Sequence, residues 1–198
     1  DFGDARGVEV RPVERRELVS QQQCDNCHDN LSLHGGARRS VSYCSFCHHP
    51  GNVNDDRVAR FEGGPIMVES VELGVMVHKI HMGARLTQQP YILGGNPSPS
   101  VANPAGSPID FGEVRYPGDQ RSCGTCHVAG AFDLPLPSGL LPTHVNEMSC
   151  LEDPTQDADS YCQTRAVTLD IATGRTASAC LSCHDAPDVR AHALTNTA

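Results

Sequence analysis

The sequence predicts a mostly irregular, loop-rich fold with short α-helices and a small apolar core. Apolar core material is scarce, because the chain of 198 residues has no tryptophan, five phenylalanines and four tyrosines. Its 18 glycines and 14 prolines are residues that interrupt helices and strands. The third observation is that the pattern C-x-x-C-H occurs four times.

The repeated pattern uses eight of the ten cysteines. C-x-x-C-H is the attachment signature of c-type haem, in which two cysteines form thioethers with the porphyrin and the histidine ligates the iron. The four copies are Cys24, Cys27 and His28; Cys44, Cys47 and His48; Cys123, Cys126 and His127; and Cys180, Cys183 and His184. They predict four covalently bound haems c. The fold class is therefore a multihaem cytochrome c in which large apolar porphyrins form the core.

Two other uses of paired cysteines explain the pattern less well. Zinc ribbons need pairs of C-x-x-C knuckles and give no reason for a histidine after every second cysteine. A thioredoxin-type dithiol needs one motif beside a βαβ pattern, which this sequence lacks.

The formal net charge is −9 with histidine neutral. No basic stripe is present, which argues against nucleic-acid binding. No apolar run has the length of a membrane-spanning helix, and no leader segment is recognised, so a mature or trimmed sequence is expected. Because c-type haem is attached outside the cytoplasm, we expect an exported protein in the periplasm, on the cell surface or in the extracellular space.

Cys150 and Cys162 remain after the motifs are assigned, and they flank an acidic, turn-rich stretch. An even remainder in an exported chain predicts a disulfide between them. Closing this short loop would stabilise the fold by about 3 kcal/mol in the chain-entropy account. A calcium loop in the same acidic stretch is the weaker alternative, because the spacing of its carboxylates fits no known pattern.

The first part of the chain is expected to hold one lead-in, one compact unit and one helix. Residues 1–23 are predicted to form an extended lead-in or an edge strand, and Pro12 limits the strand pairing that is possible there. Residues 24–49 form a unit with two haem motifs. A helix is predicted over residues 65–83, since the stretch begins with proline and ends with glycine and has apolar residues near one face.

The second part is expected to be more irregular. Residues 83–121 predict a long ordered loop, and residues 166–178 a small hairpin. A short helix is predicted over residues 186–197. Residues 24–198 together are read as one tetrahaem domain with two loose lobes, which are residues 24–82 and 123–198.

Six histidines lie outside the motifs: His34, His49, His78, His81, His144 and His192. A second axial histidine closes the iron and lowers its reduction potential relative to histidine–methionine ligation. The four methionines are the minor alternative as ligands. His34 is too close in sequence to His28 to reach across the same porphyrin, so it is expected to serve a neighbouring haem, that of Cys44 and Cys47 being one candidate.

The remaining histidines divide into a helical pair and two reserve residues. His78 and His81 are three residues apart on the predicted helix and project to a similar side, so they could cap two different haems. His49 adjoins His48 and cannot reach the far side of its own iron. His49 and His144 are therefore either reserve ligands or ordinary surface residues.

The chain resembles the OmcA/MtrC-type multihaem cytochromes of bacterial outer surfaces. The resemblance lies in "CDNCHDNLSLHGGARRSVSYCSFCHHPGN", "MVHKIHMG", "YILGG" with "DFGEVRYPGDQRSCGTCH", and "ACLSCHDAPDVRAHALTNT". It implies a haem-bearing module of an extracellular electron conduit with closely spaced bis-histidine haems. It also implies that the distal ligands are His34, His78, His81 and His192. Family modules usually carry a fifth motif and adjoin β-rich domains, which these 198 residues do not include, so either a fragment of a longer cytochrome or a stand-alone tetrahaem unit is expected. Position 49 is commonly not histidine in the family.

The function predicted from these observations is extracellular electron transfer by an electron carrier that is not an enzyme. Its expected partners are other cytochromes, copies of itself and extracellular electron acceptors. A further hypothesis is that copies of the chain form a conductive filament, in which His49 or His144 ligates a haem of an adjacent copy. The alternatives are a multihaem reductase of a small anion, which would need an open iron position, and a fragment of a longer outer-membrane decahaem conduit.

Overall fold

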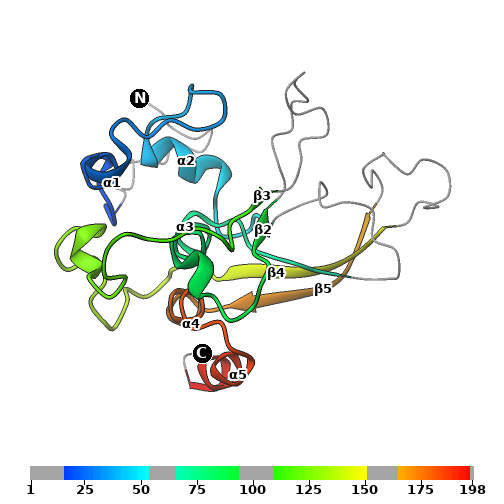
Figure 1. Ribbon diagram of the computed structural model, residues 1–198. Helices are drawn as coiled ribbons and strands as arrows, with labels where there is room; N and C mark the ends of the chain where they lie inside the picture. The colour runs from blue at the N-terminus through cyan, green and yellow to red at the C-terminus, as the bar shows by residue number, and fades with distance from the viewer. Residues whose placement is uncertain (1–15, 54–65, 94–108, 151–164, 197–198) are drawn as a thin grey trace, which may run out of the picture.

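The computed structural model describes residues 16–53, 66–93, 109–150 and 165–196. Within them, short helices and small strands are joined by long irregular connections, as the sequence predicted (Figure 1). The predicted disulfide partners are not both within these ranges, because Cys162 lies outside the described residues. No helix in the described segments is long and apolar enough to cross a bilayer.

Two short helices carry the first two motifs. Helix α1 spans Gln21–His28 and begins at a capping box, in which Ser20 and Gln23 each accept a hydrogen bond from the other's backbone N–H. Helix α2 spans Val41–Cys47, and the Gln21 side chain accepts a hydrogen bond from its first residue at 3.0 Å. Neither helix contains a buried residue.

The central helix is shorter than predicted. Helix α3 spans Leu73–Met82 and ends at Gly83, the first residue of the 3-10 helix η1 (Gly83–Arg85). The prediction of a helix from residue 65 was wrong at its start, because strand β1 occupies Ile66–Val68 and pairs with a strand far away in sequence. Glu72 then caps α3 by accepting the Val75 N–H at 3.0 Å.

A three-stranded antiparallel sheet has the order β1–β4–β5, with β4 at Thr143–Cys150 and β5 at Arg165–Thr173. The small hairpin predicted over residues 166–178 is therefore corrected: its first half pairs with β4, and its second half begins helix α4 (Arg175–Leu181). Gly174 precedes α4 as its N-cap and does not form a hairpin turn. Helix α5 (Pro187–Asn196) confirms the predicted terminal helix.

The described parts of the connection between α3 and the third motif, residues 83–93 and 109–122, hold little regular structure. Strands β2 (Ile92–Leu93) and β3 (Ile109–Asp110) pair antiparallel, and the third motif opens with the 3-10 helix η2 (Cys123–Thr125). Within these residues the irregularity agrees with the predicted loop over residues 83–121, of which residues 94–108 lie outside the described ranges.

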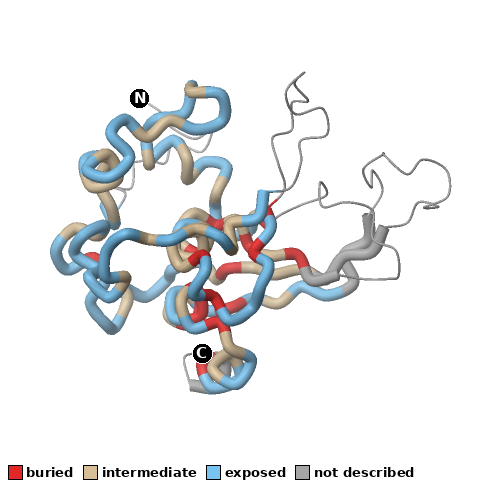
Figure 2. Tube along the Cα trace, in the orientation of Figure 1, coloured by how far each residue is buried: buried red, intermediate tan, exposed pale blue. Residues whose placement is uncertain are grey.

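Among the residues whose burial is described, the apolar core is small and lies away from α1 and α2. One buried cluster consists of Leu86, Tyr91 and Leu93, and the other of Ala177, Leu181 and Ala193. Figure 2 shows that buried residues gather around α3, α4 and the adjoining end of the β4–β5 hairpin, while α1 and α2 stay exposed or half-buried. Side-chain packing therefore stabilises the region around α3 and α4, whereas the helices of the first two motifs pack little against the rest of the chain.

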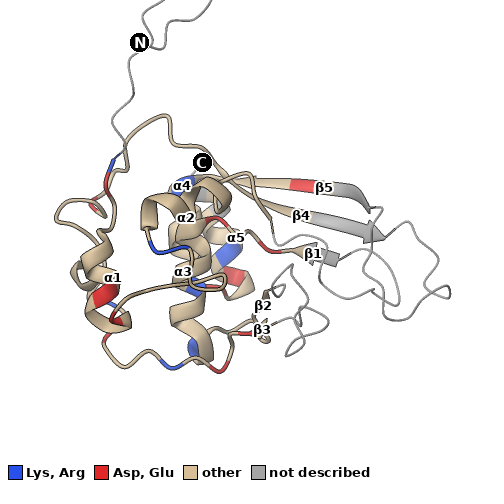
Figure 3. Ribbon diagram, turned by 90° about the horizontal axis from the view of Figure 1, so that it is seen from above, with Lys and Arg blue, Asp and Glu red and all other residues tan. Residues whose placement is uncertain are grey.

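Charged side chains of both signs are interspersed along the described ribbon (Figure 3). Several of them are paired, such as Lys79 with Glu69 at 2.6 Å and Arg175 with Glu72 at 3.0 Å.

Candidate functional site

Each motif lies at the end of a short helical turn. We number the sites by motif: site 1 is Cys24, Cys27 and His28; site 2 is Cys44, Cys47 and His48; site 3 is Cys123, Cys126 and His127; and site 4 is Cys180, Cys183 and His184. Cysteines three residues apart on a helical turn share one side of it, which is what two thioethers to one porphyrin require. All eight thiols of these sites are unpaired, so none is used in a disulfide.

Three motif histidines face a histidine from elsewhere in the chain. The ring centroids of His28 and His81 are 6.0 Å apart, those of His48 and His34 are 6.1 Å apart, and those of His127 and His78 are 5.8 Å apart. Two imidazoles that ligate one metal ion from opposite sides, each through a bond of about 2 Å, have centroids roughly 6 Å apart. All three separations therefore suit a six-coordinate iron between the rings.

Backbone carbonyls orient two of these rings. The Nδ1 of His48 donates to the carbonyl of Val71 at 2.8 Å, and the Nδ1 of His81 donates to the carbonyl of Val77 at 2.8 Å. Since a carbonyl only accepts, the proton of each ring is on Nδ1 and the lone pair is on Nε2. This is the tautomer that a metal-ligating histidine uses when its other nitrogen is held by a backbone oxygen.

The facing rings of the third pair carry polar atoms that need a partner. The Nδ1 atoms of His78 and His127 are buried and have no hydrogen-bond partner among the described residues. Leaving such an atom unsatisfied costs roughly 1–3 kcal/mol. On a ring that ligates iron through Nε2, Nδ1 points away from the metal, so these two atoms need a partner other than the haem.

Burial keeps several of these histidines in the neutral form that binds metal. Desolvation lowers the pKa of His78, and the nearby ring of His127 lowers it further. Desolvation is also the main cause that lowers the pKa of His127 and the pKa of His34. A depressed pKa means that the lone pair is available at neutral pH without competition from a proton.

The backbone around His34 explains why glycines follow it. His34 has φ +51°, Gly35 φ +81° and Gly36 φ +85°, so three successive residues adopt the left-handed conformation. Glycine takes this conformation at no steric cost, whereas histidine takes it at some cost. The tight turn that results brings the His34 ring to His48 of the next motif, the neighbour that the sequence suggested.

The thiols show which sites are neighbours. Burial raises the pKa of the Cys24 thiol, and the charges of Cys126, Asp25 and Cys44 raise it further. Burial likewise raises the pKa of Cys183, with Cys123 the next cause. Site 1 therefore lies close to both site 2 and site 3, and site 3 lies close to site 4.

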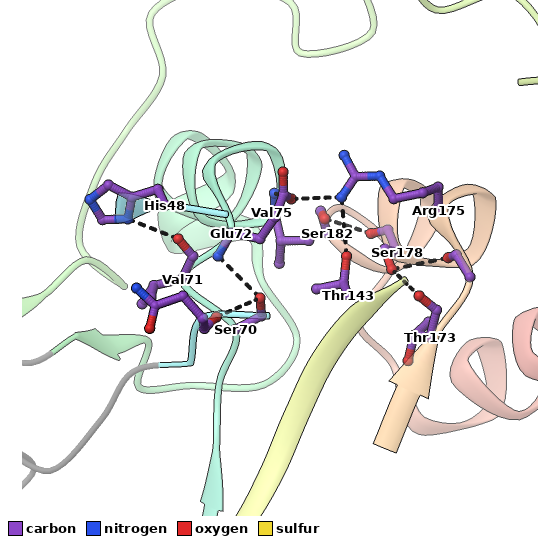
Figure 4. A network of polar contacts seen from close by, with 12 residues as sticks. His48, Ser70, Val71, Glu72, Val75, Thr143, Thr173, Arg175, Ser178 and Ser182 are labelled. Atoms are coloured by element: carbon purple, nitrogen blue, oxygen red, sulfur yellow. Dashed lines mark hydrogen bonds and ion pairs between the residues drawn. The ribbon is translucent and has the colours of Figure 1, made fainter. Parts of the chain in front are cut away.

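A polar network ties site 2 to the start of α3 (Figure 4). Val71, whose carbonyl holds His48, donates its own N–H to Asn52 at 3.1 Å. The buried hydroxyl of Ser70 accepts the Glu72 N–H at 3.1 Å, which fixes the residue that caps α3.

The same network continues from α3 to α4 (Figure 4). The carboxylate of Glu72 is buried and pairs with Arg175, whose guanidinium also donates to Thr143 on β4 at 3.2 Å. The helix that carries His78 and His81 is thus anchored to the helix that leads into site 4.

Site 4 has a different surrounding from the other three. His184 is exposed, and the next residue, Asp185, is buried and accepts the N–H groups of Thr87 and Gln88 at 2.8 and 2.7 Å. The helix that carries His192 packs against α4 through Ala193. These contacts fix the segments on which His184 and His192 lie.

The reserve residue His49 is exposed just after α2, and the other, His144, lies on strand β4. On β4, the Nδ1 of His144 lies 2.8 Å from a carboxylate oxygen of Asp170 on the neighbouring strand. The backbone N–H of His144 donates to Pro50 at 3.2 Å, one residue after His49. A carboxylate on Nδ1 leaves Nε2 as the atom of His144 that can meet another group.

The cysteine motifs and the paired histidines together fit haem c. Large apolar side chains are exposed beside the attachment cysteines, with Tyr43 51% and Phe46 72% accessible on α2. Exposed apolar surface of this kind suits a site that binds a large apolar ring. The donor set of two thiols and two imidazoles is that of a bis-histidine c-type haem.

Comparison with known proteins agrees with this chemistry. Residues 16–198 match the family of outer membrane cytochrome MtrC/MtrF-like proteins, domains II/IV. The chain belongs to this family. Membership implies covalently bound haem c as the cofactor.

A shorter match is found to the multihaem cytochrome MtrC of Shewanella baltica (strain OS185), with 41% identity over 44 residues. That match covers 21% of this chain and 7% of the relative's length. No solved structure matches the chain.

Several groups that position the candidate ligand histidines could not be predicted from the sequence. The carbonyls of Val71 and Val77 orient ligand candidates, and any residue could supply a carbonyl at those positions. Tyr116 stands against His81 with their ring planes perpendicular, and Gln120 donates to the His81 carbonyl at 2.6 Å. The only available signal was that both residues lie a few positions before the third motif.

Proposed function

We propose that this chain is an extracellular electron carrier that holds four c-type haems with closed, bis-histidine iron sites. The observation that carries the proposal is the facing of three motif histidines with three non-motif histidines at 5.8–6.1 Å. A bound haem supplies one-electron redox chemistry. The residues of the chain hold it covalently, close its iron on both faces and set its surroundings.

The arrangement favours a carrier over a reductase of a small anion. A reductase needs an iron with one open axial position and acid–base groups around it. At sites 1, 2 and 3 both positions have a histidine at ligating separation, so a small anion would have to displace a ligand.

For site 4 the proposed pair is His184 with His192. The family resemblance assigns His192 as a distal ligand, and α5 carries it close to the end of α4. The eight proposed axial ligands are then His28, His48, His127, His184, His34, His78, His81 and His192.

The proposed order of the sites along the molecule is 2, 1, 3, 4. Helix α3 supplies His81 to site 1 and His78 to site 3, which brings these two sites together. Val128, next to site 3, donates its N–H to Leu18, just before site 1, at 3.0 Å. The neighbouring thiols extend the series at both ends, and close spacing is what electron transfer between redox groups requires.

The proposed location is the outer cell surface or the extracellular space. The predicted disulfide between Cys150 and Cys162 suits such an oxidising environment. Other cytochromes and extracellular acceptors are the proposed partners, either for a stand-alone unit or for a module of a longer conduit. The division into a lead-in over residues 1–23 and two lobes also stays a prediction.

A repeating filament is the more specific form of the proposal. Two histidines, His49 and His144, remain after the eight proposed ligands are assigned. The contact of His144 Nδ1 with Asp170 leaves its Nε2 for another partner. Changing His49 and His144 singly to alanine tests it: a ligand across a subunit boundary would leave one haem high-spin and shorten filaments. Unchanged spectra and particle size would assign both residues to the surface.

The carrier function is tested by recording the spin state of the haems and measuring whether the reduced protein binds carbon monoxide. Ferric and ferrous spectra are expected to be low-spin for all four haems, because two imidazoles give a strong ligand field. Carbon monoxide is therefore expected not to bind the reduced protein at neutral pH. Rapid binding of one equivalent, with one high-spin haem in the untreated protein, would favour the reductase.

A further inference from the structure

Tyr116 lies between sites 1 and 3. Its ring centroid is 5.7 Å from that of His81, with the two planes at 90°. It also interacts electrostatically with the side chains of Cys126 in site 3 and Cys27 in site 1. One side chain thus contacts a proposed ligand of site 1 and lies near a proposed attachment residue of site 3.

The loop that carries Tyr116 is fastened to the end of α3. The carbonyl of Val114 accepts the Ala84 N–H at 2.9 Å, and Gln120 donates to the His81 carbonyl at 2.6 Å. The Tyr116 ring itself lies against the backbone of Gly118, since a Cβ there would be 3.1 Å from its Cε1. The position of the Tyr116 ring beside His81 is therefore fixed by the anchored loop and by its packing on Gly118.

Site 1 differs from sites 2 and 3 in the orientation of its two imidazoles. The planes of His28 and His81 are at 65°, whereas those of His34 and His48 are at 28° and those of His78 and His127 are at 30°. The Tyr116 ring is perpendicular to that of His81, whereas Phe132 meets His127 of site 3 at 63°. The edge-to-face contact restricts rotation of His81 about its side-chain bonds.

We propose that Tyr116 is a positioning residue that holds the His81 imidazole crossed to that of His28. The proposal rests on the proposed function, in which these two histidines ligate one iron. Val77 fixes the Nδ1 end of the His81 ring, and Tyr116 fixes the rotation of the plane. Crossed axial planes leave the ferric iron with nearly degenerate orbitals and a strongly anisotropic low-spin signal, while near-parallel planes give an ordinary rhombic signal.

The test compares electron paramagnetic resonance spectra of the fully loaded ferric protein and its variants. The parent is expected to show one strongly anisotropic low-spin signal from site 1, identified by its disappearance in His81→Ala. Tyr116→Leu removes the ring, so this signal is expected to shift toward the rhombic type and the potential of the same haem to change. Tyr116→Phe keeps the ring and is expected to retain the parent signal.

Phe132→Leu is the matched control, because Phe132 is an exposed aromatic residue that meets His127 of site 3 edge-on. It is expected to leave the site 1 signal unchanged. An unchanged signal and potential in Tyr116→Leu would overturn the role of Tyr116 while leaving the four closed irons intact. A parent without low-spin haems, or a His81→Ala variant that alters no signal, would instead overturn the proposed function.

Discussion

Replacing His81 with alanine is expected to open one of the four irons and leave the other three closed. The His81 ring is 6.0 Å from that of His28, and the helix offers no second imidazole to that position, because His78 faces His127. With one axial ligand removed, one quarter of the haem is expected to become high-spin and to bind carbon monoxide after reduction.

His78→Ala is expected to open a different iron, that of site 3, so the double variant opens two. Optical spectra and carbon monoxide titration of the loaded proteins measure the number of open irons. Val77→Ala is the control, since Val77 lies on the same helix, is 37% exposed and contributes only its backbone carbonyl to His81. If the double variant opened no more haem than either single variant, α3 would not serve two sites.

The second large effect is expected from breaking the buried pair between Glu72 and Arg175. Glu72 is 7% exposed, accepts the Val75 N–H and lies 3.0 Å from Arg175. Arg175→Met would leave the Glu72 carboxylate buried without its partner, and we expect a loss of about 3 kcal/mol in the free energy of unfolding.

Because α3 carries both His78 and His81, the destabilisation is expected to affect sites 1 and 3. Glu72→Gln keeps an oxygen for the Val75 N–H but removes the charge, so it separates the ion pair from the cap. Denaturant unfolding of both single variants and the double variant gives the coupling energy. Independent, additive losses would show that Glu72 and Arg175 do not act as a pair. Arg121→Met is the control, because its ion pair with Asp119 is on the surface.

The sequence was most informative where chemistry depends on residue type and short spacing. Four C-x-x-C-H motifs indicated the proposed attachment positions, and the three-residue spacing of His78 and His81 predicted that both lie on one helix, as they do on α3. The closeness of His34 to His28 directed attention to the next motif, and the structure brings His34 to His48. His34 and the two glycines that follow it all adopt positive φ, which forms the turn that makes this approach possible.

Long-range pairing was what the sequence did not reveal. Residues 66–68 have a pattern compatible with the helix that follows, but their backbone pairs with β4, about eighty residues later in the chain. The first part of residues 166–178 likewise finds its strand partner outside the predicted hairpin. Carbonyl contacts such as that of Val71 with His48 depend on backbone position and not on side-chain identity, so no residue pattern indicates them.

The measurement that tests the central claim most directly is the intact mass of the denatured protein. Thioethers survive denaturation, whereas a metal ion or non-covalent haem is lost. The mass is expected to equal that of the polypeptide plus four haems, and mutation of one cysteine pair, such as Cys123 and Cys126 to alanine, is expected to remove one of them. A mass equal to the bare polypeptide, with zinc found in the native protein, would contradict the account.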